Sequence, residues 1–374
     1  MRLWPLLASG IAVATFAATA VSAPPPVTAR AYILVNPATE EVLVERAADR
    51  KLPMASTTKM MTAIVTLERT KLGNLVVVPR TAAAPGGSTS GLVPGERLSV
   101  RALLTGLMVG SGNDASVTLA TYVGRGSEQR FVKLMNAEAV AMGLTNTHFA
   151  NPHGLDHAGH YSTVRDLVAL GQQTLQRPFL RQVVAHRVAR IPGPGGHGSR
   201  RLESENDLLS IDRDADGIKT GHTGGSGYSV VAHARRKRIG IELYVAIIGS
   251  PGRGQRARDA KRLLDWGFTQ YVRVVPLRKG QVIMSVPVRD RPGVVAPLTV
   301  DTELAATIKA GHALKRTIVA PAELIAPVAA GAVVGEVRVT DGARLVGVRK
   351  LIVVQAIDGP SVAERIRSGI GRLV

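Results

Sequence analysis

Three short motifs in this chain carry the residue types needed for nucleophilic chemistry at a serine. They are Ser56–Lys59 (STTK), Ser111–Asn113 (SGN) and Lys219–Gly221 (KTG). A single S-x-x-K motif is weak evidence for a catalytic site, because average residue usage gives about one such match by chance in a chain of this length. A second S-x-N, Ser204–Asn206, lies close to Lys219 and precedes no helix, so we exclude it. Together, and each in a fitting local context, the three motifs indicate a nucleophilic site.

The spacing of Ser56 and Lys59 suits acyl transfer. Residues three apart on a helix share a face, so the Lys59 amine can reach the Ser56 hydroxyl and act as its base. A lysine with its ordinary pKa of about 10.4 would be protonated, so Lys59 must be buried or crowded by a second cation, which Lys219 can supply. A serine at a helix start also lies near free backbone donors that favour an oxyanion. Ser111 and Asn113 would relay protons and hold an amide, and Lys219 would bind an anionic group.

Sequence patterns place these motifs on separate elements of one domain. Apolar residues recur at helical spacing over 57–72, and Ser56 stands where an N-cap belongs, so a buried helix is predicted there. The second motif lies between two predicted helices, 100–109 and 114–122, and the third lies on a predicted strand, 217–223. The other predicted elements are a strand hairpin, a helix, two strands and a closing helix: 29–46, 131–142, 228–234, 239–249 and 257–272. Helices flanking antiparallel strands predict an α+β fold for a domain over 29–272.

Beyond residue 272 the sequence changes to short apolar, often β-branched runs broken by Pro and Gly. Together with a hairpin signal at Asp341 and Gly342, this pattern predicts a small all-β domain over 273–357. The last segment, 360–374, has an apolar face and several arginines. It is interpreted either as a helix that lies on an anionic membrane or as a plain surface helix.

The N-terminus has the pattern of an export signal. Arg2 precedes an apolar stretch that ends in small residues before Pro24–Pro26. We predict a signal peptide over 1–23, with cleavage after Ala20 favoured over cleavage after Ala23, which would leave proline at the new N-terminus. Because the stretch is near the length of a membrane span, a retained anchor is the alternative. The exported protein would act in the periplasm or on the outer face of the cytoplasmic membrane.

The composition narrows the classes of partner. Forty-seven Lys and Arg against 28 Asp and Glu give a net charge of +19, which predicts anionic surroundings such as lipid or wall polymer. The sequence has no cysteine, which excludes disulfides, thiol catalysis and Cys-ligated zinc. Nucleic acid is not an expected partner, because aromatic residues are only 3% of the chain, the arginines are spread out and no recognised motif is present.

With their surroundings, the motifs resemble the serine penicillin-binding DD-peptidases of the low-molecular-mass D-alanyl-D-alanine carboxypeptidase group. The likeness extends to Asp216–Thr223 (DGIKTGHT), Asn151–Asp156 (NPHGLD) and His160–Thr163 (HYST), and it covers most of 29–272. A β domain followed by an amphipathic tail matches that family in arrangement. The resemblance implies a penicillin-binding, β-lactamase-like transpeptidase domain. Gly112, the middle residue of the second motif, is typical of the carboxypeptidase branch of this family.

The resemblance also implies a role for each residue of the first two motifs. Ser56 would be the acylated nucleophile and Lys59 its base, with Ser111 and Asn113 as the second wall of the site. The backbone amides of Ser56 and His222 would form the oxyanion hole. The implied activity removes the terminal D-alanine from peptidoglycan stem pentapeptides through an acyl-enzyme. It needs no cofactor or metal, and penicillin and other β-lactams would inhibit it covalently.

Substrate-binding residues are implied on the third motif and just ahead of the closing helix: Lys219, Thr220, Gly221, His222 and Arg256. Lys219 and Thr220 would bind the terminal carboxylate of the substrate. Arg256 falls where such enzymes keep another carboxylate-binding arginine.

Several alternatives stay open. Endopeptidase action on crosslinks would use the same apparatus. A β-lactamase is disfavoured, because Glu203 and Glu205 do not make the Glu-x-x-Leu-Asn pattern that positions a deacylating water, so slow turnover of β-lactams is expected. Four histidines and an aspartate crowd His148–His160 and suggest a zinc peptidase, although no HExxH occurs. A non-catalytic envelope-binding homologue is the last alternative, and the intact serine–lysine pair argues against it.

Overall fold

The computed structural model describes residues 9–14, 22–83, 85–289, 291, 293–359 and 361–364. The chain divides into two compact units. The first spans Ala23–Phe268, and the second begins at Thr269 and includes the strand at residues 9–14. Each unit has its own hydrophobic core, built from residues within 31–248 in the first and within 277–357 in the second.

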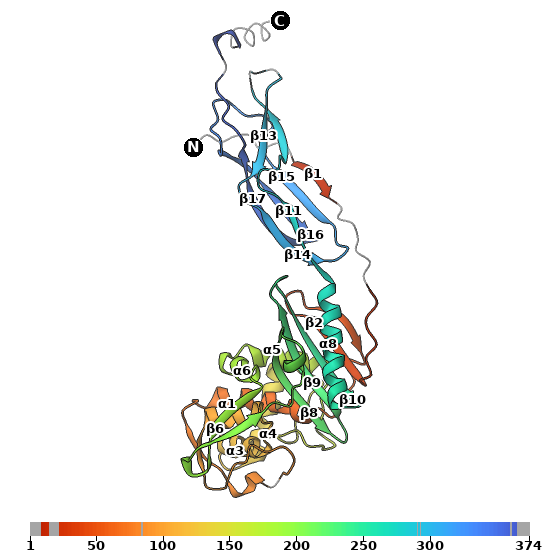
Figure 1. Ribbon diagram of the computed structural model, residues 1–374, viewed down its shortest axis with the longest axis vertical. Helices are drawn as coiled ribbons and strands as arrows, with labels where there is room; N and C mark the ends of the chain where they lie inside the picture. The colour runs from red at the N-terminus through yellow and green to blue at the C-terminus, as the bar shows by residue number, and fades with distance from the viewer. Residues whose placement is uncertain are drawn as a thin grey trace. The chain divides into compact units, whose positions relative to one another are not determined.

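The first unit is built on a five-stranded antiparallel sheet in the order β3-β2-β10-β9-β8 (Figure 1). Its strands are β2 (Ala31–Asn36), β3 (Glu41–Arg46), β8 (Ala215–Thr223), β9 (Gly227–Arg236) and β10 (Ile241–Ser250). Ala31, Ile33 and Val35 on β2 belong to the main core of the unit. Leu34, which points the other way, lies against Gly267 of the closing helix. The alternation of side chains along the strand therefore buries both faces of the sheet.

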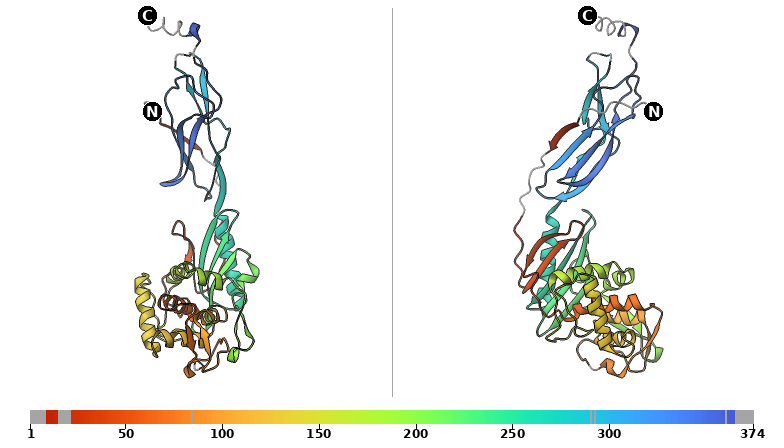
Figure 2. Two further views of the ribbon diagram at one scale, coloured as in Figure 1. Left: turned by 90° about the vertical axis from the view of Figure 1, so that its left-hand side faces the viewer. Right: turned by 180° about the vertical axis from the view of Figure 1, so that it is seen from behind.

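Helices cover both faces of this sheet. The closing helix α8 (Arg253–Thr269) runs along one face, and α5 (Val164–Leu175) packs on the other (Figures 1 and 2). The remaining helices are α1 (Lys59–Arg69), α2 (Val100–Met108), α3 (Asn113–Val123), α4 (Glu128–Ala141), α6 (Pro178–Val184) and α7 (Leu208–Ile211). Short 3-10 turns and two small two-stranded sheets complete the unit: η1 (Ala55–Thr58), η2 (Arg80–Ala83), η3 (Pro194–Gly196), β4 (Leu75–Val77) with β5 (Arg97–Ser99), and β6 (Val188–Pro192) with β7 (Ser199–Glu203).

The prediction that Ser56 caps a helix is wrong. Ser56 lies inside the 3-10 turn η1, and α1 begins at Lys59 with Thr58 in the cap position. The Ser56 hydroxyl lies against the Lys59 amine and therefore does not cap the backbone. From Lys59 to Thr66 every residue of α1 is buried, as expected of a helix surrounded by others.

The second unit is all β, as predicted. One sheet has the order β1-β15-β16-β17-β13-β12, and β11 pairs with β14 in a second. The strands are β1 (Ser9–Ala14), β11 (Tyr271–Leu277), β12 (Met284–Pro287), β13 (Val295–Val300), β14 (Leu304–Lys309), β15 (Leu314–Val319), β16 (Val333–Asp341) and β17 (Arg344–Val353). Asp341 pairs with Arg344, and Gly342 has a φ of 56° between them, which confirms the predicted hairpin. The closing helix ends at Thr269, before the predicted 272, because Tyr271 already belongs to β11.

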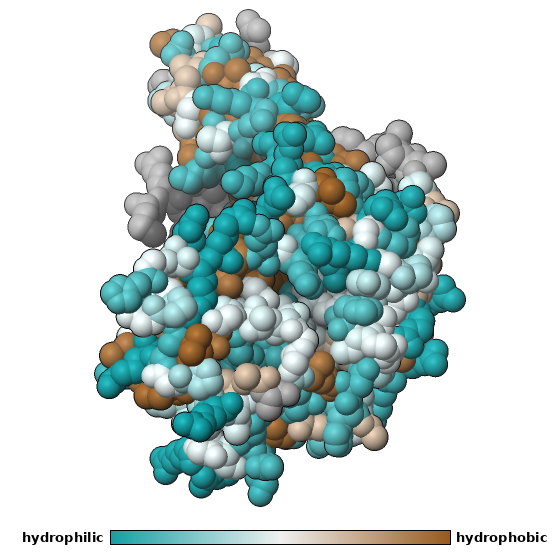
Figure 3. Space-filling view, turned by 60° about the horizontal axis from the view of Figure 1, so that its bottom comes forward, coloured by the Kyte–Doolittle hydropathy of each residue, from teal (hydrophilic) through white to brown (hydrophobic). Residues whose placement is uncertain are grey.

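Both ends of the chain include residues outside the described ranges. Strand β1 falls within the predicted signal peptide and pairs antiparallel with β15. Of the predicted tail, 360–374, only 361–364 lie within the described residues. No helix in the described part of the chain is long and apolar enough to span a bilayer. The face drawn in Figure 3 is largely hydrophilic, with hydrophobic side chains scattered over it.

Candidate active site

Ser56 and Lys59 lie together where η1 passes into α1. The Lys59 Nζ lies 2.8 Å from the Ser56 Oγ, 2.7 Å from the Asn113 Oδ1 and 2.8 Å from the backbone oxygen of His153. The amide and backbone oxygens only accept hydrogen bonds, so an uncharged amine donates its two hydrogens to them. Its lone pair is then directed at the Ser56 hydroxyl. This is the arrangement of a nucleophile and its base.

Burial explains how the Lys59 amine can act as a base. The side chain is fully buried, and the resulting loss of hydration holds its pKa well below the ordinary lysine value. The positive charge of Lys219 lowers this pKa further, whereas the carboxylates of Glu205 and Asp114 oppose the shift. The amine is therefore able to lose its proton far more readily than a solvated lysine, as a general base must.

Strand β8 places the third motif beside the second. The buried Lys219 Nζ donates to the Ser111 Oγ over 2.9 Å and to the backbone oxygen of Thr220 over 3.0 Å. Ser111 itself has a φ of 56° in the break between α2 and α3. Burial lowers the pKa of Lys219 to about 8, with Glu205 opposing the shift and Arg256 adding to it. Lys219 therefore keeps its positive charge at neutral pH and can attract an anionic substrate group.

Two glycines allow backbone segments to meet at Ser56. A Cβ at Gly221 would lie 2.7 Å from the Ser56 backbone nitrogen, and a Cβ at Gly154 would lie 2.0 Å from the Ala55 carbonyl oxygen. Gly154 also has a φ of 97°, a conformation that other residues avoid. Strand β8 and the turn at 151–155 therefore enclose the peptide between Ala55 and Ser56 from two directions.

Arg256 is almost completely buried, with 2% of its surface exposed. It lies within the first turns of α8, not just ahead of the helix as predicted, because α8 already begins at Arg253. One guanidinium nitrogen donates to the backbone oxygen of Glu205 over 2.7 Å, and another lies 3.5 Å from the backbone oxygen of Ser229. Burial lowers the pKa of Arg256 to about 10. Its positive charge also lowers the pKa of Lys219, so the two cations interact electrostatically.

The other residues predicted on the third motif follow along β8. Thr220 is buried, and its backbone oxygen accepts from Lys219. The side chain of His222 is exposed and stacks on Tyr228, with 4.0 Å between the ring centroids. The histidine ring is thus held at the edge of the site by Tyr228, and it is the backbone amide of His222 that the predicted oxyanion hole requires.

The turn at 151–154 supplies a group that the motif spacing does not identify. The backbone oxygen of His153 accepts from the lysine amine, as described above. The preceding carbonyl, of Pro152, accepts from the hydroxyls of Thr62 on α1 and Ser116 on α3. These bonds fasten the turn to both helices. The NPHGLD string marked this turn as part of the resemblance but gave it no role.

Asp114 is a second residue that the sequence reasoning missed. Its carboxylate accepts from the Thr89 hydroxyl over 2.6 Å and from the backbone nitrogens of Ser90 and Leu92, each over 2.9 Å. It follows Asn113 directly and so ties the loop at 85–97 to the second motif. An aspartate after S-x-N is the available signal, although in sequence it also fits an ordinary first-turn acid of α3.

The histidine-rich stretch offers no metal site in the part of the chain that is described. No group of three His, Cys, Asp or Glu side chains there could hold a metal ion. His160 is buried, with its Nε2 2.7 Å from the Thr58 Oγ1 and its Nδ1 3.0 Å from the Ala150 backbone nitrogen. Burial lowers the pKa of His153 to about 4. The zinc alternative therefore has no ligand set among these residues.

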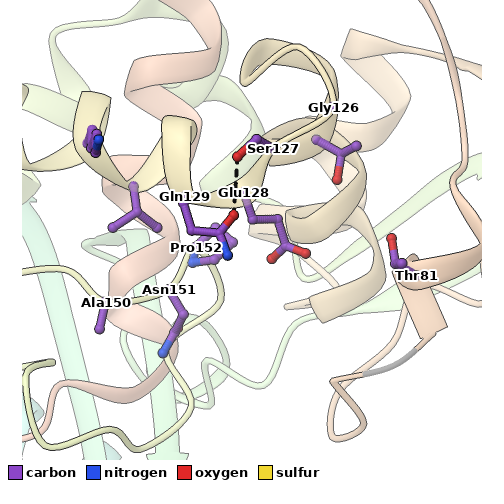
Figure 4. Close-up of a pocket in the computed structure, with 11 residues that line it drawn as sticks. Thr81, Gly126, Ser127, Glu128, Gln129, Ala150, Asn151 and Pro152 are labelled. Atoms are coloured by element: carbon purple, nitrogen blue, oxygen red, sulfur yellow. Dashed lines mark hydrogen bonds between the residues drawn. The ribbon is translucent and has the colours of Figure 1, made fainter.

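A cavity of about 590 Å³ shares Asn151 and Pro152 with the same turn (Figure 4). Ser127 donates to the Gln129 side chain at its rim, and the Glu128 carboxylate lies next to them. Burial raises the pKa of Glu128. None of the motif residues lines this cavity, so the candidate active site is identified by its chemistry and not by this hollow.

Comparisons with known proteins agree with the resemblance. The sequence profile of the D-alanyl-D-alanine carboxypeptidase family matches residues 17–251. D-alanyl-D-alanine carboxypeptidase DacA of Escherichia coli (strain K12) is 35% identical over 353 residues, which cover 91% of this chain and 86% of that protein. The structure of penicillin binding protein 5 from Haemophilus influenzae is 28% identical with a TM-score of 0.64, over 90% of this chain and 99% of that one.

The Streptomyces K15 DD-transpeptidase is 31% identical with a TM-score of 0.62, over 66% of this chain and all of that chain. The predicted fold, a penicillin-binding α+β domain followed by an all-β domain, is confirmed by these structures. With the profile match and the DacA likeness, they show that this chain belongs to the D-alanyl-D-alanine carboxypeptidase family of serine hydrolases.

Proposed function

We propose that this enzyme is a DD-carboxypeptidase that removes the terminal D-alanine from peptidoglycan stem pentapeptides through an acyl-enzyme on Ser56. The main support for this catalytic centre is the position of the buried Lys59 amine. It lies 2.8 Å from the Ser56 Oγ, and its other two hydrogen-bond partners, the Asn113 Oδ1 and the His153 backbone oxygen, are acceptors. The family supplies the substrate class.

Acylation begins when the Ser56 hydroxyl gives its proton to the uncharged Lys59 amine and the Oγ attacks the carbonyl carbon of the penultimate D-alanine. The backbone N–H groups of Ser56 and His222 would hold the oxyanion. As the C–N bond breaks, the proton on Lys59 passes to the leaving nitrogen, and D-alanine departs. In deacylation Lys59 takes a proton from the attacking water and returns it to the Ser56 Oγ.

The cationic side of the site would bind the free carboxylate that distinguishes a carboxypeptidase substrate. Lys219 is charged at neutral pH, and the buried Arg256 lies within its electrostatic reach. Thr220 follows on the same strand. Ser111, hydrogen-bonded to Lys219, and Asn113, hydrogen-bonded to Lys59, form the facing wall. Because Lys219 is charged, its bond to Ser111 is charge-assisted and stronger than a bond between neutral groups.

β-Lactams would enter the same reaction and stop it. Attack by the Ser56 Oγ on the ring amide opens the ring, and the leaving nitrogen stays tethered to the acyl group. The leaving group therefore stays in the active site after ring opening, and the acyl-enzyme turns over slowly. We expect covalent labelling by penicillin with little hydrolysis.

The N-terminal sequence supports export to the periplasm or the outer face of the cytoplasmic membrane, where stem peptides are found. The basic composition supports a peripheral contact between the C-terminal tail and anionic lipid. No feature of the described residues favours endopeptidase activity over carboxypeptidase activity.

Fluorescent-penicillin labelling and D-alanine release from a pentapeptide test the assignment together. We expect the wild-type protein to do both and Ser56→Ala to do neither. Ser210→Ala is the matched control, because Ser210 is an exposed serine on α7. Persistence of both signals in Ser56→Ala would refute the proposal.

Adding an acceptor D-amino acid measures how the acyl-enzyme divides between water and amine, and predominant transfer to the amine would contradict a carboxypeptidase.

A further inference from the structure

His160 is a buried residue that the proposed mechanism does not use. Only 2% of its surface is exposed, and Phe149 packs against the ring edge-on, with 5.9 Å between centroids. Both ring nitrogens have hydrogen-bond partners. A buried histidine with two partners in fixed positions is held in one orientation and one tautomer, which makes it suitable for positioning other groups.

The partners determine the direction of each hydrogen bond. The Ala150 backbone N–H can only donate, so the His160 Nδ1 accepts and carries no proton. The Nε2 therefore carries the proton and donates it to the Thr58 Oγ1, 2.7 Å away. The Thr58 hydroxyl in turn donates to the Ala55 carbonyl oxygen over 2.8 Å. Burial lowers the pKa of His160 to about 3, so the ring stays neutral and the directions do not change at working pH.

The Ala55 carbonyl belongs to the same peptide unit as the Ser56 N–H. Because a peptide unit is planar and trans, fixing the carbonyl also fixes the direction of the N–H. Ala55 has a φ of 49°, which an alanine adopts only when its surroundings enforce it. A donor on the carbonyl oxygen also polarises the peptide and strengthens its N–H as a donor.

We propose that His160 is a positioning residue for acylation, acting through Thr58 on the peptide between Ala55 and Ser56 so that the Ser56 N–H is aimed at the oxyanion. The proposal rests on the proposed function, in which that N–H is one of two oxyanion donors. His160 touches no reacting atom. It acts on the transition state indirectly, through its hydrogen bond to Thr58, the hydrogen bond from Thr58 to the Ala55 carbonyl, and the planar peptide that links this carbonyl to the Ser56 N–H.

Two variants of Thr58 test the chain of bonds. Thr58→Val keeps the shape but removes the hydroxyl, whereas Thr58→Ser keeps the hydroxyl. We expect Thr58→Val to lower the acylation rate constant with penicillin about tenfold, less than the loss of a whole oxyanion donor, with little change in the dissociation constant of the complex that precedes acylation. Thr58→Ser should stay within about twofold of the wild type. An acylation rate in Thr58→Val equal to that of the wild type overturns the proposal.

The pH profile and the final extent of labelling separate this role from other effects. The acid limb of acylation belongs to Lys59, so Thr58→Val should leave its position unchanged, and a shifted limb would show that the lysine was disturbed instead. Complete labelling of Ser56 after long incubation shows that the variant is folded. His160→Phe should slow acylation like Thr58→Val, and full activity in it also contradicts the proposal. If the wild type itself fails to label, the proposed function fails, not this inference.

Discussion

The two lysines of the centre share full burial but need opposite charge states. Lys59 must be neutral to accept a proton, and Lys219 must be charged to attract a carboxylate. Loss of hydration lowers both pKa values, and the charge of Lys219 then lowers that of Lys59 further. The two requirements are therefore coupled, because the cation proposed to bind substrate also helps to keep its neighbour uncharged.

This coupling predicts a shift in the pH profile of Lys219→Gln. Removing the charge takes away one cause of the low Lys59 pKa, so that pKa rises and the acid limb of acylation moves to higher pH. In the wild type the rate should also fall above about pH 8, as Lys219 loses its proton, and this alkaline limb should be lost in the variant. Penicillin acylation rates between pH 5 and 10, each scaled to its own maximum, check both limbs. Lys237→Gln, at an exposed lysine, is the control. Unchanged limbs would show that Lys219 does not act on Lys59.

The break between α2 and α3 depends on close packing against the loop at 85–97. A Cβ at Gly112 would lie 2.2 Å from the Ser90 Oγ and 2.4 Å from an Asp114 carboxylate oxygen. The next residue, Asn113, holds the Lys59 amine. The small residue in the middle of this motif is therefore required by the neighbouring loop, and its substitution would displace the asparagine.

Gly112→Ala should destabilise the protein by about 1–3 kcal/mol and slow penicillin acylation, because the loop and the motif must move apart. Ser90→Ala should be nearly neutral, since the Ser90 hydroxyl is buried without a partner. Combined with Gly112→Ala it should restore part of both losses, because it removes the closest contact. Thermal unfolding and labelling rates of the four proteins provide the measurement. Purely additive effects would mean that the contact between these two residues is not the cause.

The elements around the motifs were predictable because their signals are local. Helical spacing after Ser56 and the turn residues at Asp341 and Gly342 depend on neighbours in sequence, and the corresponding helix and hairpin are present. The 3-10 turn at Ser56 was not predictable, since it depends on contacts with Gly154 and Gly221, far away in the chain. The same holds for His160, which the sequence offered only as part of the resemblance and of the disfavoured zinc alternative, and which is a hydrogen-bond partner of Thr58 in the fold.

At the scale of the whole molecule, the two units have separate cores. The buried cluster of the first lies within 31–248 and that of the second within 277–357. The Streptomyces K15 DD-transpeptidase structure matches 66% of this chain with all of its own chain, so the chain in that structure has no counterpart of the remainder. The proposed chemistry also uses residues of the first unit alone. These observations favour a first unit that folds and reacts without the second.

A shortened protein of residues 22–270 should therefore retain activity on soluble substrates. It keeps α8, which carries Arg256 and covers one face of the sheet, and omits β1 and every strand from β11 onward. We expect kcat/KM for D-alanine release from a soluble pentapeptide within about threefold of the full-length value, since no catalytic group is lost, and penicillin labelling that Ser56→Ala abolishes in the same background. Circular dichroism establishes that the fragment is folded. A folded fragment that neither labels nor releases D-alanine would show that the β unit contributes to the active site, and one that labels but releases no D-alanine would place that contribution in deacylation or in peptide binding.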